Sequence, residues 1–373
     1  MALVFGILVL LVAGFTPVWT KTTAPTNNGY AWIASSADGK IVCAINSYRP
    51  AVFTTNRGDT WTTNGTPTAA FDIAISADGT KLIMSAETND GFCILVSTNT
   101  GNTWRQTILP GGEWLAVASS ADGAILFAAN SIGFIYASTN SGATWHTNTA
   151  YSKNWTSIAC SADGKRAVAT ARVDQIYAST DSGMSWTPTT VSSKYWSSIC
   201  SSSDGRILAA TGEDGTSIST NFGNTWITNS IFGQSIACSA DGKRLIVAGG
   251  LTIWISTDSG MTWATNNLPG WCSGVASSAD GCKLWAVDVT SFGIWVGQTT
   301  PSPELKIQPT GSNFAFSWIV PSTNFVLQQN LDLSTTNWVT LTNAPTLNLS
   351  NLHDEITLSP SSGGGFFRLA APP

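Results

Sequence analysis

The octet STDSGMTW, residues 256–263, closes a run of β-branched and aromatic residues with a turn and a tryptophan. Close copies recur along the chain: TTNRGDTW (54–61), STNTGNTW (97–104), STNSGATW (138–145), STDSGMSW (179–186) and STNFGNTW (219–226). In each copy the Asn or Asp can accept hydrogen bonds from backbone N–H groups two residues on, and the Gly can take the left-handed conformation. We therefore predict that each octet is a turn, and that its Thr-Trp begins the next strand.

A second motif, Asp-Gly, usually within Ser-Ala-Asp-Gly, accompanies the octet. Its seven copies begin at Asp38, Asp78, Asp122, Asp163, Asp204, Asp241 and Asp280. The intervals between them are 40, 44, 41, 41, 37 and 39 residues, a period expected of a four-stranded β-propeller blade rather than of a helical solenoid. Apolar alternation on both sides of each copy predicts two strands joined by a hairpin, with both central residues of the turn at φ > 0.

The octet resembles the Asp-box, Ser/Thr-x-Asp-x-Gly-x-Thr-Trp, of sialidase-like propellers. That resemblance implies a turn between the third and fourth strands of a blade, on the face away from any active site. Because Asp and Asn exchange freely at the third position, we interpret the octets as folding devices rather than metal or catalytic sites. The structural turn residues are Asn56, Asn99, Asn140, Asp181, Asn221 and Asp258.

The chain is predicted to be all-β, with a seven-bladed propeller over residues 17–300. No octet follows Asp280, but Thr16-Pro17-Val18-Trp19 lies nineteen residues before Asp38, close to the spacing from each octet Trp to the next Asp-Gly. We expect this N-terminal segment to supply the outer strand of the last blade and so close the ring.

Two further segments flank the propeller. Residues 1–16, MALVFGILVLLVAGFT, are apolar throughout and predict a signal peptide, although no Lys or Arg precedes the apolar run. The alternative is a buried strand. Residues 301–373 carry short alternating runs without either motif and predict a small β-sandwich, similar to a C-terminal module of secreted bacterial proteins.

Composition narrows the function. The net charge is -5 and only 10% of residues are charged, so a nucleic-acid partner is not expected. Two His residues and scattered Cys residues predict no metal site and no cofactor. Cys160, Cys200 and Cys238 recur near one place in successive repeats, which favours small core positions over disulfides.

Functional side chains are expected on the upper face, defined here as the face opposite the two turn motifs. A sialidase would need an arginine triad, for which only Arg49 and Arg172 are candidates, and a hydrolase like the xyloglucan-cleaving propellers would need a carboxylate pair. Nothing in the spacing selects such a pair from the available residues. These are Asp72, Glu87, Asp90, Glu113, Asp174, Glu213, Asp214 and Asp288.

Aromatic residues begin most first strands, where they could stack on sugars or grip a peptide, or simply pack between blades. The ligand-binding candidates are Trp32, Arg49, Trp114, Trp155, Arg172, Trp196 and Trp271.

The repeat pattern is also similar to that of photosystem II assembly-factor propellers, which implies protein binding without catalysis. We expect a secreted, periplasmic or cell-surface monomer that binds a protein or a glycan and is not an enzyme. The alternatives are a glycoside hydrolase of the sialidase-like fold and a structural spacer.

Overall fold

The computed structural model describes residues 17–26, 29–63, 69–110, 112–299, 304–321, 324–332, 334–359 and 365–371, with the side chains of residues 148–150 left aside. The predicted signal peptide, residues 1–16, lies outside these ranges. Over the described ranges the chain forms strands and turns but no helix, as the all-β prediction requires. No helix suited to crossing a membrane occurs in these ranges.

Each of the first five repeats forms four antiparallel strands. The first is β2 (Trp32–Ser35), β3 (Val42–Ile45), β4 (Val52–Thr54) and β5 (Thr62–Thr63); the second is β6 (Ala69–Ile75), β7 (Leu82–Thr88), β8 (Gly91–Ser97) and β9 (Arg105–Gln106). The third is β10 (Trp114–Ser119), β11 (Leu126–Asn130), β12 (Gly133–Ser138) and β13 (His146–Lys153). The fourth is β14 (Trp155–Cys160), β15 (Ala167–Asp174), β16 (Ile176–Ser179) and β17 (Thr187–Pro188); the fifth is β18 (Lys194–Ser201), β19 (Leu208–Gly212), β20 (Gly215–Ser219) and β21 (Ile227–Asn229).

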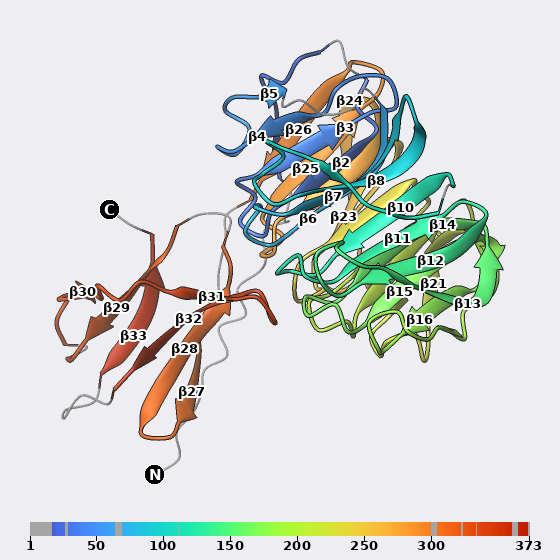
Figure 1. Ribbon diagram of the computed structural model, residues 1–373. Coiled ribbons are helices and arrows are strands. Elements are labelled where there is room, and N and C mark those ends of the chain that lie inside the picture. Colours follow the sequence, from blue (N-terminus) through green and yellow to red (C-terminus); the bar gives the residue numbers. More distant parts are fainter. Residues whose placement is uncertain are drawn as a thin grey trace.

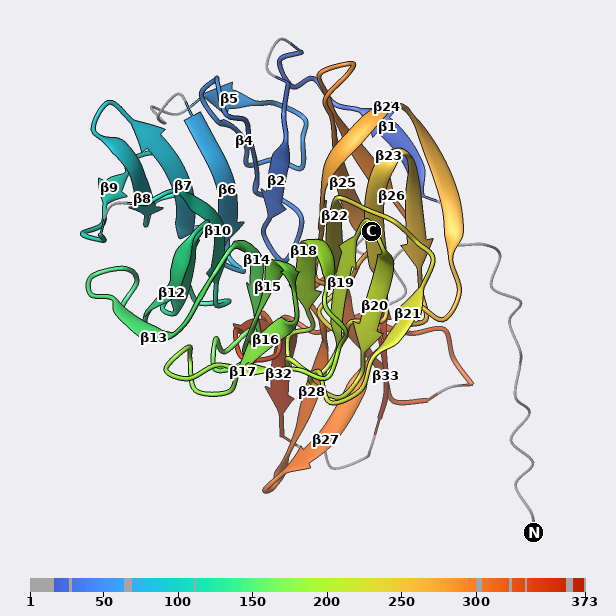
Figure 2. The ribbon, with the colours of Figure 1, turned by 90° about the vertical axis from the view of Figure 1, so that its right-hand side faces the viewer.

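The last two repeats share long strands. They consist of β22 (Ser235–Cys238), β23 (Leu245–Ser256), β24 (Ala264–Ser277), β25 (Lys283–Asp288) and β26 (Gly293–Gln298). β1 (Val18–Lys21), from the N-terminal segment, pairs antiparallel with β26 in the register Val18↔Gln298 to Lys21↔Trp295. Figure 2 shows the sheets following one another around a central axis.

Every Asp-Gly motif makes the same hairpin turn. In the first copy the Gly39 N–H donates to the Ser36 carbonyl oxygen at 3.0 Å, and Asp38 Oδ1 accepts from the Ser36 hydroxyl at 2.7 Å and the Lys40 N–H at 3.0 Å. Only Gly39 has positive φ, at 66°. The prediction of two positive-φ residues is therefore wrong, since Asp38 stays in the ordinary region and the Gly forms the bulge after a four-residue turn.

The octet turns also differ in detail from the expectation. In the STNSGATW copy, Ser138 Oγ accepts the Asn140 and Gly142 N–H groups at 3.3 and 2.9 Å, and Asn140 Oδ1 accepts the Thr144 N–H at 2.8 Å. The Asn thus bonds four residues on rather than two. The residue before each Gly is left-handed as well, at Arg57, Thr100, Ser141, Ser182, Phe222 and Ser259.

The two turn types lie together on one face, called the lower face below. The Ser141 N–H of the third octet donates to the Ala124 carbonyl oxygen, two residues after Asp122, at 2.8 Å. Octet glycines also pack on the preceding sheet, since a Cβ at Gly101 (φ +77) would lie 2.7 Å from the Phe53 ring. Glycine is needed there for its conformation and for this close approach.

A cyclic chain of backbone hydrogen bonds joins the seven Asp-Gly turns. In each turn the residue before the Asp donates its N–H to the carbonyl oxygen of the corresponding residue in the next turn, at 2.7–2.9 Å. The order of donors is Ala37, Ala77, Ala121, Ala162, Ser203, Ala240 and Ala279, and Ala279 donates back to Ala37.

Two sheets form the C-terminal module, here residues 304–371. One contains β27 (Lys306–Thr310), β28 (Asn313–Ile319), β32 (His353–Leu358) and β31 (Thr346–Asn348), and the other contains β30 (Val339–Thr340), β29 (Val326–Asn330) and β33 (Phe366–Ala370). Phe316, Trp318 and Ile356 of the first sheet pack with Leu327 and Phe367 of the second. These side chains form one small core shared by the two sheets, which lie beside each other in Figure 1.

The module covers the centre of the lower face. Val320, together with Leu347, Leu349 and Leu352 around β31, packs against the alanines of the Asp-Gly turns. Leu352 also lines the lower part of the central space, beside Ala37 and Ala162. The sequence did not predict this contact.

All seven cysteines have free thiols. Burial raises the pKa of Cys160 to about 12 and that of Cys200 well above its usual range. These thiols are protonated and pack as small core side chains.

Candidate binding face

The upper face carries the loops between the second and third strand of each repeat and the links into each first strand. Among the predicted aromatic residues, Trp32 and Trp271 lie at the start of their first strands and are 36% and 44% exposed. Trp32 lies six and Trp271 nine residues before the next Asp-Gly, whereas Trp114, Trp155 and Trp196 each lie eight residues before theirs and are only 1–2% exposed. The rings of these last three have no free face on which a sugar could stack.

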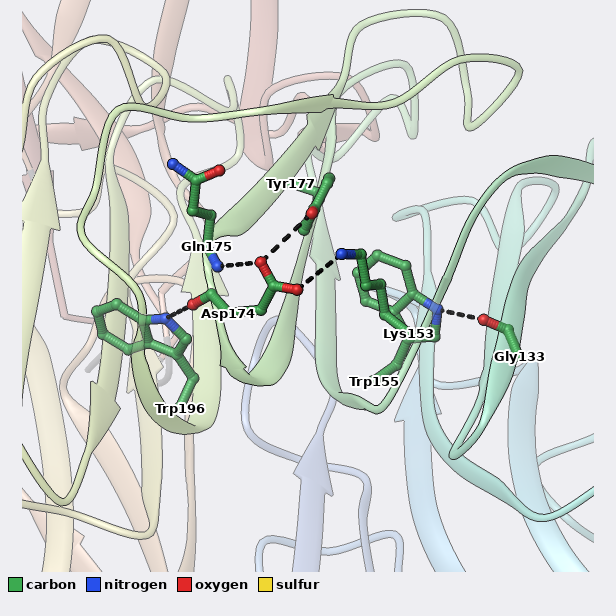
Figure 3. Close-up of polar contacts among 7 residues, drawn as sticks. All are labelled: Gly133, Lys153, Trp155, Asp174, Gln175, Tyr177 and Trp196. Atoms are coloured by element: carbon green, nitrogen blue, oxygen red, sulfur yellow. Dashed lines mark hydrogen bonds and ion pairs between the residues drawn. The ribbon is translucent and has the colours of Figure 1, made fainter.

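The buried tryptophans join neighbouring repeats. Trp155 Nε1–H donates to the Gly133 carbonyl oxygen and Trp196 Nε1–H to the Asp174 carbonyl oxygen, both at 2.9 Å (Figure 3). Each acceptor lies in the preceding repeat, where Gly133 begins the third strand, β12, and Asp174 ends the second strand, β15. These bonds satisfy the buried indole N–H groups, so the rings act in packing between sheets.

The two predicted arginines are both exposed but lie in different repeats. Arg49 lies in the loop between β3 and β4 of the first repeat, whereas Arg172 lies on β15 of the fourth, with its guanidinium 5.8 Å from the Tyr195 ring centre. Two complete repeats separate them along the chain. The structure does not bring them together as the start of a carboxylate-binding triad.

The predicted carboxylates are also dispersed. Asp174 accepts from Lys153 Nζ at 2.8 Å (Figure 3). Burial raises the pKa of Asp174, but the contacts with Lys153, the Gln175 N–H and Tyr177 together outweigh burial and lower it. Asp288 is buried and accepts the N–H groups of Thr290 and Ser291, so it holds its own loop. Glu113 accepts from the Ser131 hydroxyl at 3.1 Å, in the third repeat.

Asp72 is placed differently, in a pocket at the centre of the upper face. The pocket encloses about 200 Å³ and is lined by residues of all seven innermost strands, β2, β6, β10, β14, β18, β22 and β24. Asp72 Oδ1 accepts the Ile73 N–H and Oδ2 accepts the Val117 N–H, each at 2.8 Å. Burial nevertheless raises the pKa of Asp72 to about 7, against the effect of these two donors.

Sequence reasoning missed the most extensive feature of this face, an exposed set of apolar side chains that we call the apolar rim. Its members lie at or beside the tips of the loops between second and third strands, in six of the seven repeats. They are Tyr48 (87% exposed), Phe92 (36%), Ile132 (80%), Val173 (54%), Leu251 (58%) and Phe292 (45%). The signal was available in the sequence, since each lies a few residues after the buried run of its second strand.

The described residues contain no group of three or more His, Cys, Asp or Glu side chains that could hold a metal ion. The upper face therefore offers apolar contacts, a few charges and one polar pocket.

No family model matches the chain. No curated protein matches it either. Among solved structures, YCF48 from Cyanidioschyzon merolae aligns with a TM-score of 0.57 and 16% identity, over 75% of this chain and 98% of that one. YCF48 bound to D1 peptide gives 0.59 and 17%, over 76% and 97%. The GH74 enzyme of Niastella koreensis gives 0.62 and 15%, over 80% of this chain and 59% of the enzyme.

These structures are β-propellers, so the chain has a β-propeller fold and that part of the prediction is confirmed. At 15–17% identity the likeness extends to the fold alone.

Proposed function

We propose that this protein is a non-enzymatic propeller that binds an extended segment of a partner protein across its upper face. The apolar rim is the observation that carries the proposal. Isolated exposed apolar residues are common on soluble proteins, but here one recurs at the same loop in six repeats, around a single face. An array of apolar contacts with polar groups at its centre suits a peptide backbone and its side chains.

A structural neighbour supports the choice of a protein partner over a glycan. YCF48 has been solved bound to D1 peptide, which makes peptide binding a property that this fold can carry. The exposed tryptophans, Trp32 and Trp271, would contribute to the same face.

The rival function is glycoside hydrolysis, as in the GH74 enzyme. Hydrolysis would need two carboxyl groups facing each other across one cleft. Asp72 lines the central pocket, Asp174 is engaged by Lys153 in the fourth repeat, and Asp288 holds a loop in the seventh. This dispersion favours binding without catalysis, and hydrolysis of any fluorogenic glycoside panel member would overturn that part of the proposal.

We also propose that the repeats form a closed ring of seven blades, with β1 as the outer strand of the last. The cyclic chain of hydrogen bonds through the seven turns and the pairing of β1 with β26 both support it. A closed ring leaves no unpaired sheet edge at the join.

A phage-displayed random dodecapeptide library tests the binding proposal. Peptides selected on the wild-type protein are expected to bind at least tenfold more weakly to a Tyr48→Ser, Phe92→Ser, Phe292→Ser variant, because each change removes exposed apolar contact area. The matched control replaces Met184 and Met261, which are 60% and 81% exposed on octet turns of the lower face, by Ser.

Equal binding to the rim variant and to the wild type would contradict the proposal. If no peptide is selected and a glycan array gives a positive result, the ligand is a glycan and not a protein. Failure of both screens would favour the spacer alternative.

A further inference from the structure

The central pocket of the upper face is polar and nearly free of charge. Its described lining contains a single ionisable side chain, that of Asp72, and otherwise hydroxyl, amide and aliphatic groups and the indole of Trp32. The polar members besides Asp72 are Thr156, Ser157, Ser197, Ser198, Gln234, Ser235 and Ser273.

The repeats show what the position of Asp72 requires for folding. Ser157, Ser198 and Ser235 hold matching places on β14, β18 and β22, and each hydroxyl oxygen accepts an N–H from the next innermost strand at 3.1–3.2 Å. Asp72 Oδ2 makes the same bond, to the Val117 N–H of β10. One oxygen atom is enough for this bond, so the negative charge of Asp72 is not needed to join the strands.

The charge also has no compensating cation in the pocket. The described lining includes no Lys, Arg or His, and only backbone N–H groups act to lower the pKa of Asp72. Removing a carboxylate from water without a countercharge is costly, and a ligand that brings a positive charge would offset that cost. The hydroxyls keep one free lone pair each after accepting an N–H, so they can accept further donors.

The pocket is accessible from the upper face. Trp32, 36% exposed, lies at its edge, within the area enclosed by the apolar rim. At the opposite end of the central space, Leu352 of the C-terminal module lies among the turn alanines. A ligand group would therefore enter from the side on which we place the partner.

We propose that this pocket receives the ammonium group of a lysine side chain from the bound partner, with the Asp72 carboxylate as its counterion. The inference rests on the proposed function, because the rim would position the peptide whose lysine enters the pocket. An ammonium group carries three N–H donors, which matches one carboxylate surrounded by hydroxyl acceptors.

The test uses the full chain and Nα-acetyl-lysine methylamide as the probe, with saturation-transfer NMR and titration. The norleucine analogue, which lacks the ammonium group, is the ligand control. Asp72→Ser is the informative variant, since it installs the residue that β14, β18 and β22 use and keeps an oxygen for the Val117 N–H. Asp90→Ser, which removes an exposed carboxylate of the same repeat from outside the pocket lining, is the matched protein control.

The lysine probe should bind the wild type, bind Asp72→Ser at least tenfold more weakly, and retain most of its affinity for Asp90→Ser. The norleucine analogue should bind none of these three proteins. With a pKa of about 7 for Asp72, wild-type affinity should rise about tenfold between pH 6 and pH 8, and this readout needs no variant to fold.

Equal affinity of the lysine probe for the wild type and Asp72→Ser, or no wild-type binding at about 50 mM probe and pH 8, would overturn the inference. The small probe does not need the apolar rim. If the rim substitutions do not weaken peptide binding but the lysine probe still binds, only the proposed function is contradicted. If they weaken peptide binding but the lysine probe does not bind, only the lysine pocket is contradicted.

Discussion

At the scale of single residues, the octet turns explain why Asp and Asn exchange. When the third residue is Asn, as at Asn140, its Nδ2 donates to the Thr144 hydroxyl at 2.9 Å. When it is Asp, as at Asp181, the Ser185 hydroxyl donates to Oδ2 at 2.5 Å instead. The hydroxyl serves as acceptor or donor, so both residues complete the same turn.

Because the hydroxyl can act as either acceptor or donor, we predict that Asn140→Asp changes the free energy of unfolding by less than about 0.5 kcal/mol. Ser138→Ala should lower it by about 1–2 kcal/mol, because the Gly142 N–H then loses its acceptor in a buried place. Urea unfolding followed by tryptophan fluorescence measures both. A larger cost for Asn140→Asp than for Ser138→Ala would contradict this account of the turn.

Asp72 gives a pH dependence of stability. Its pKa is near 4 in the unfolded chain and about 7 in the folded protein, so ionisation disfavours folding and stability is lost as pH rises from about 4 to 7. Asp72→Ser removes that loss. We expect the free energy of unfolding of the variant, relative to that of the wild type, to increase by about 1–2 kcal/mol from pH 5 to pH 8. This value is below the full linkage free energy because water in the pocket screens the charge. A pH-independent difference between the two urea midpoints would show that Asp72 titrates normally.

At the scale of strands, β1 shows how segments far apart in sequence complete a sheet. Four residue pairs, Val18↔Gln298 to Lys21↔Trp295, attach it to β26, and Trp19 packs beside the core of the sixth and seventh repeats. Without β1, β26 would be an unpaired edge.

A chain that begins at Thr22 should therefore unfold at a lower temperature and aggregate more readily than a chain that begins at Pro17. Differential scanning calorimetry and light scattering provide the comparison, and the Pro17 chain controls for loss of the first sixteen residues. Identical unfolding temperatures for the two chains would contradict a stabilising role for β1.

The sequence predicted the strands better than the contacts between them. The forty-residue period and the positions of both turns follow from local chemistry, because Gly, Asp and Ser act within a few residues of themselves. The left-handed residue before each octet Gly was missed, since it is Arg57 or Phe222 as readily as Ser and gives no local signal. The burial of Trp155 and Trp196 was unpredictable for a different reason, because their acceptors belong to the neighbouring repeat.

The carboxylates of the candidate site illustrate the same limit. From the sequence alone, all eight carboxylates were equally good candidates for a functional site. Only the packing of the innermost strands brings Asp72 to the centre, while Asp174 and Asp288 remain near separate loops. The docking of the C-terminal module could not be predicted either, since the alanine cluster against which Leu352 packs is assembled from six different turns.

At the scale of the whole molecule, the two faces of the propeller carry different structural features. The lower face carries the seven Asp-Gly turns and the six octet turns and is covered at its centre by the module, whereas the upper face carries the apolar rim and the pocket. The proposed partner site and the module therefore lie on opposite sides of the propeller.

The module contact predicts a stability effect that is specific to one leucine. Leu352→Ser should lower the free energy of unfolding by about 1–2 kcal/mol, because Leu352 packs against the turn alanines. Leu331→Ser in the same module, where the side chain is 68% exposed, should change it by less than about 0.5 kcal/mol. Equal effects of the two substitutions in thermal unfolding would argue against docking of the module on the lower face.

Amide hydrogen exchange tests the ring itself most directly. The Ala279 N–H donates to the Ala37 carbonyl oxygen at 2.7 Å, a bond that joins the last Asp-Gly turn to the first. A closed ring predicts that the Ala279 amide is protected to the same degree as the amides of Ala77 and Ala121, which make the same bond between adjacent repeats. Exchange at Ala279 at the rate of an unprotected loop, with Ala77 and Ala121 still protected, would show that the ring is open.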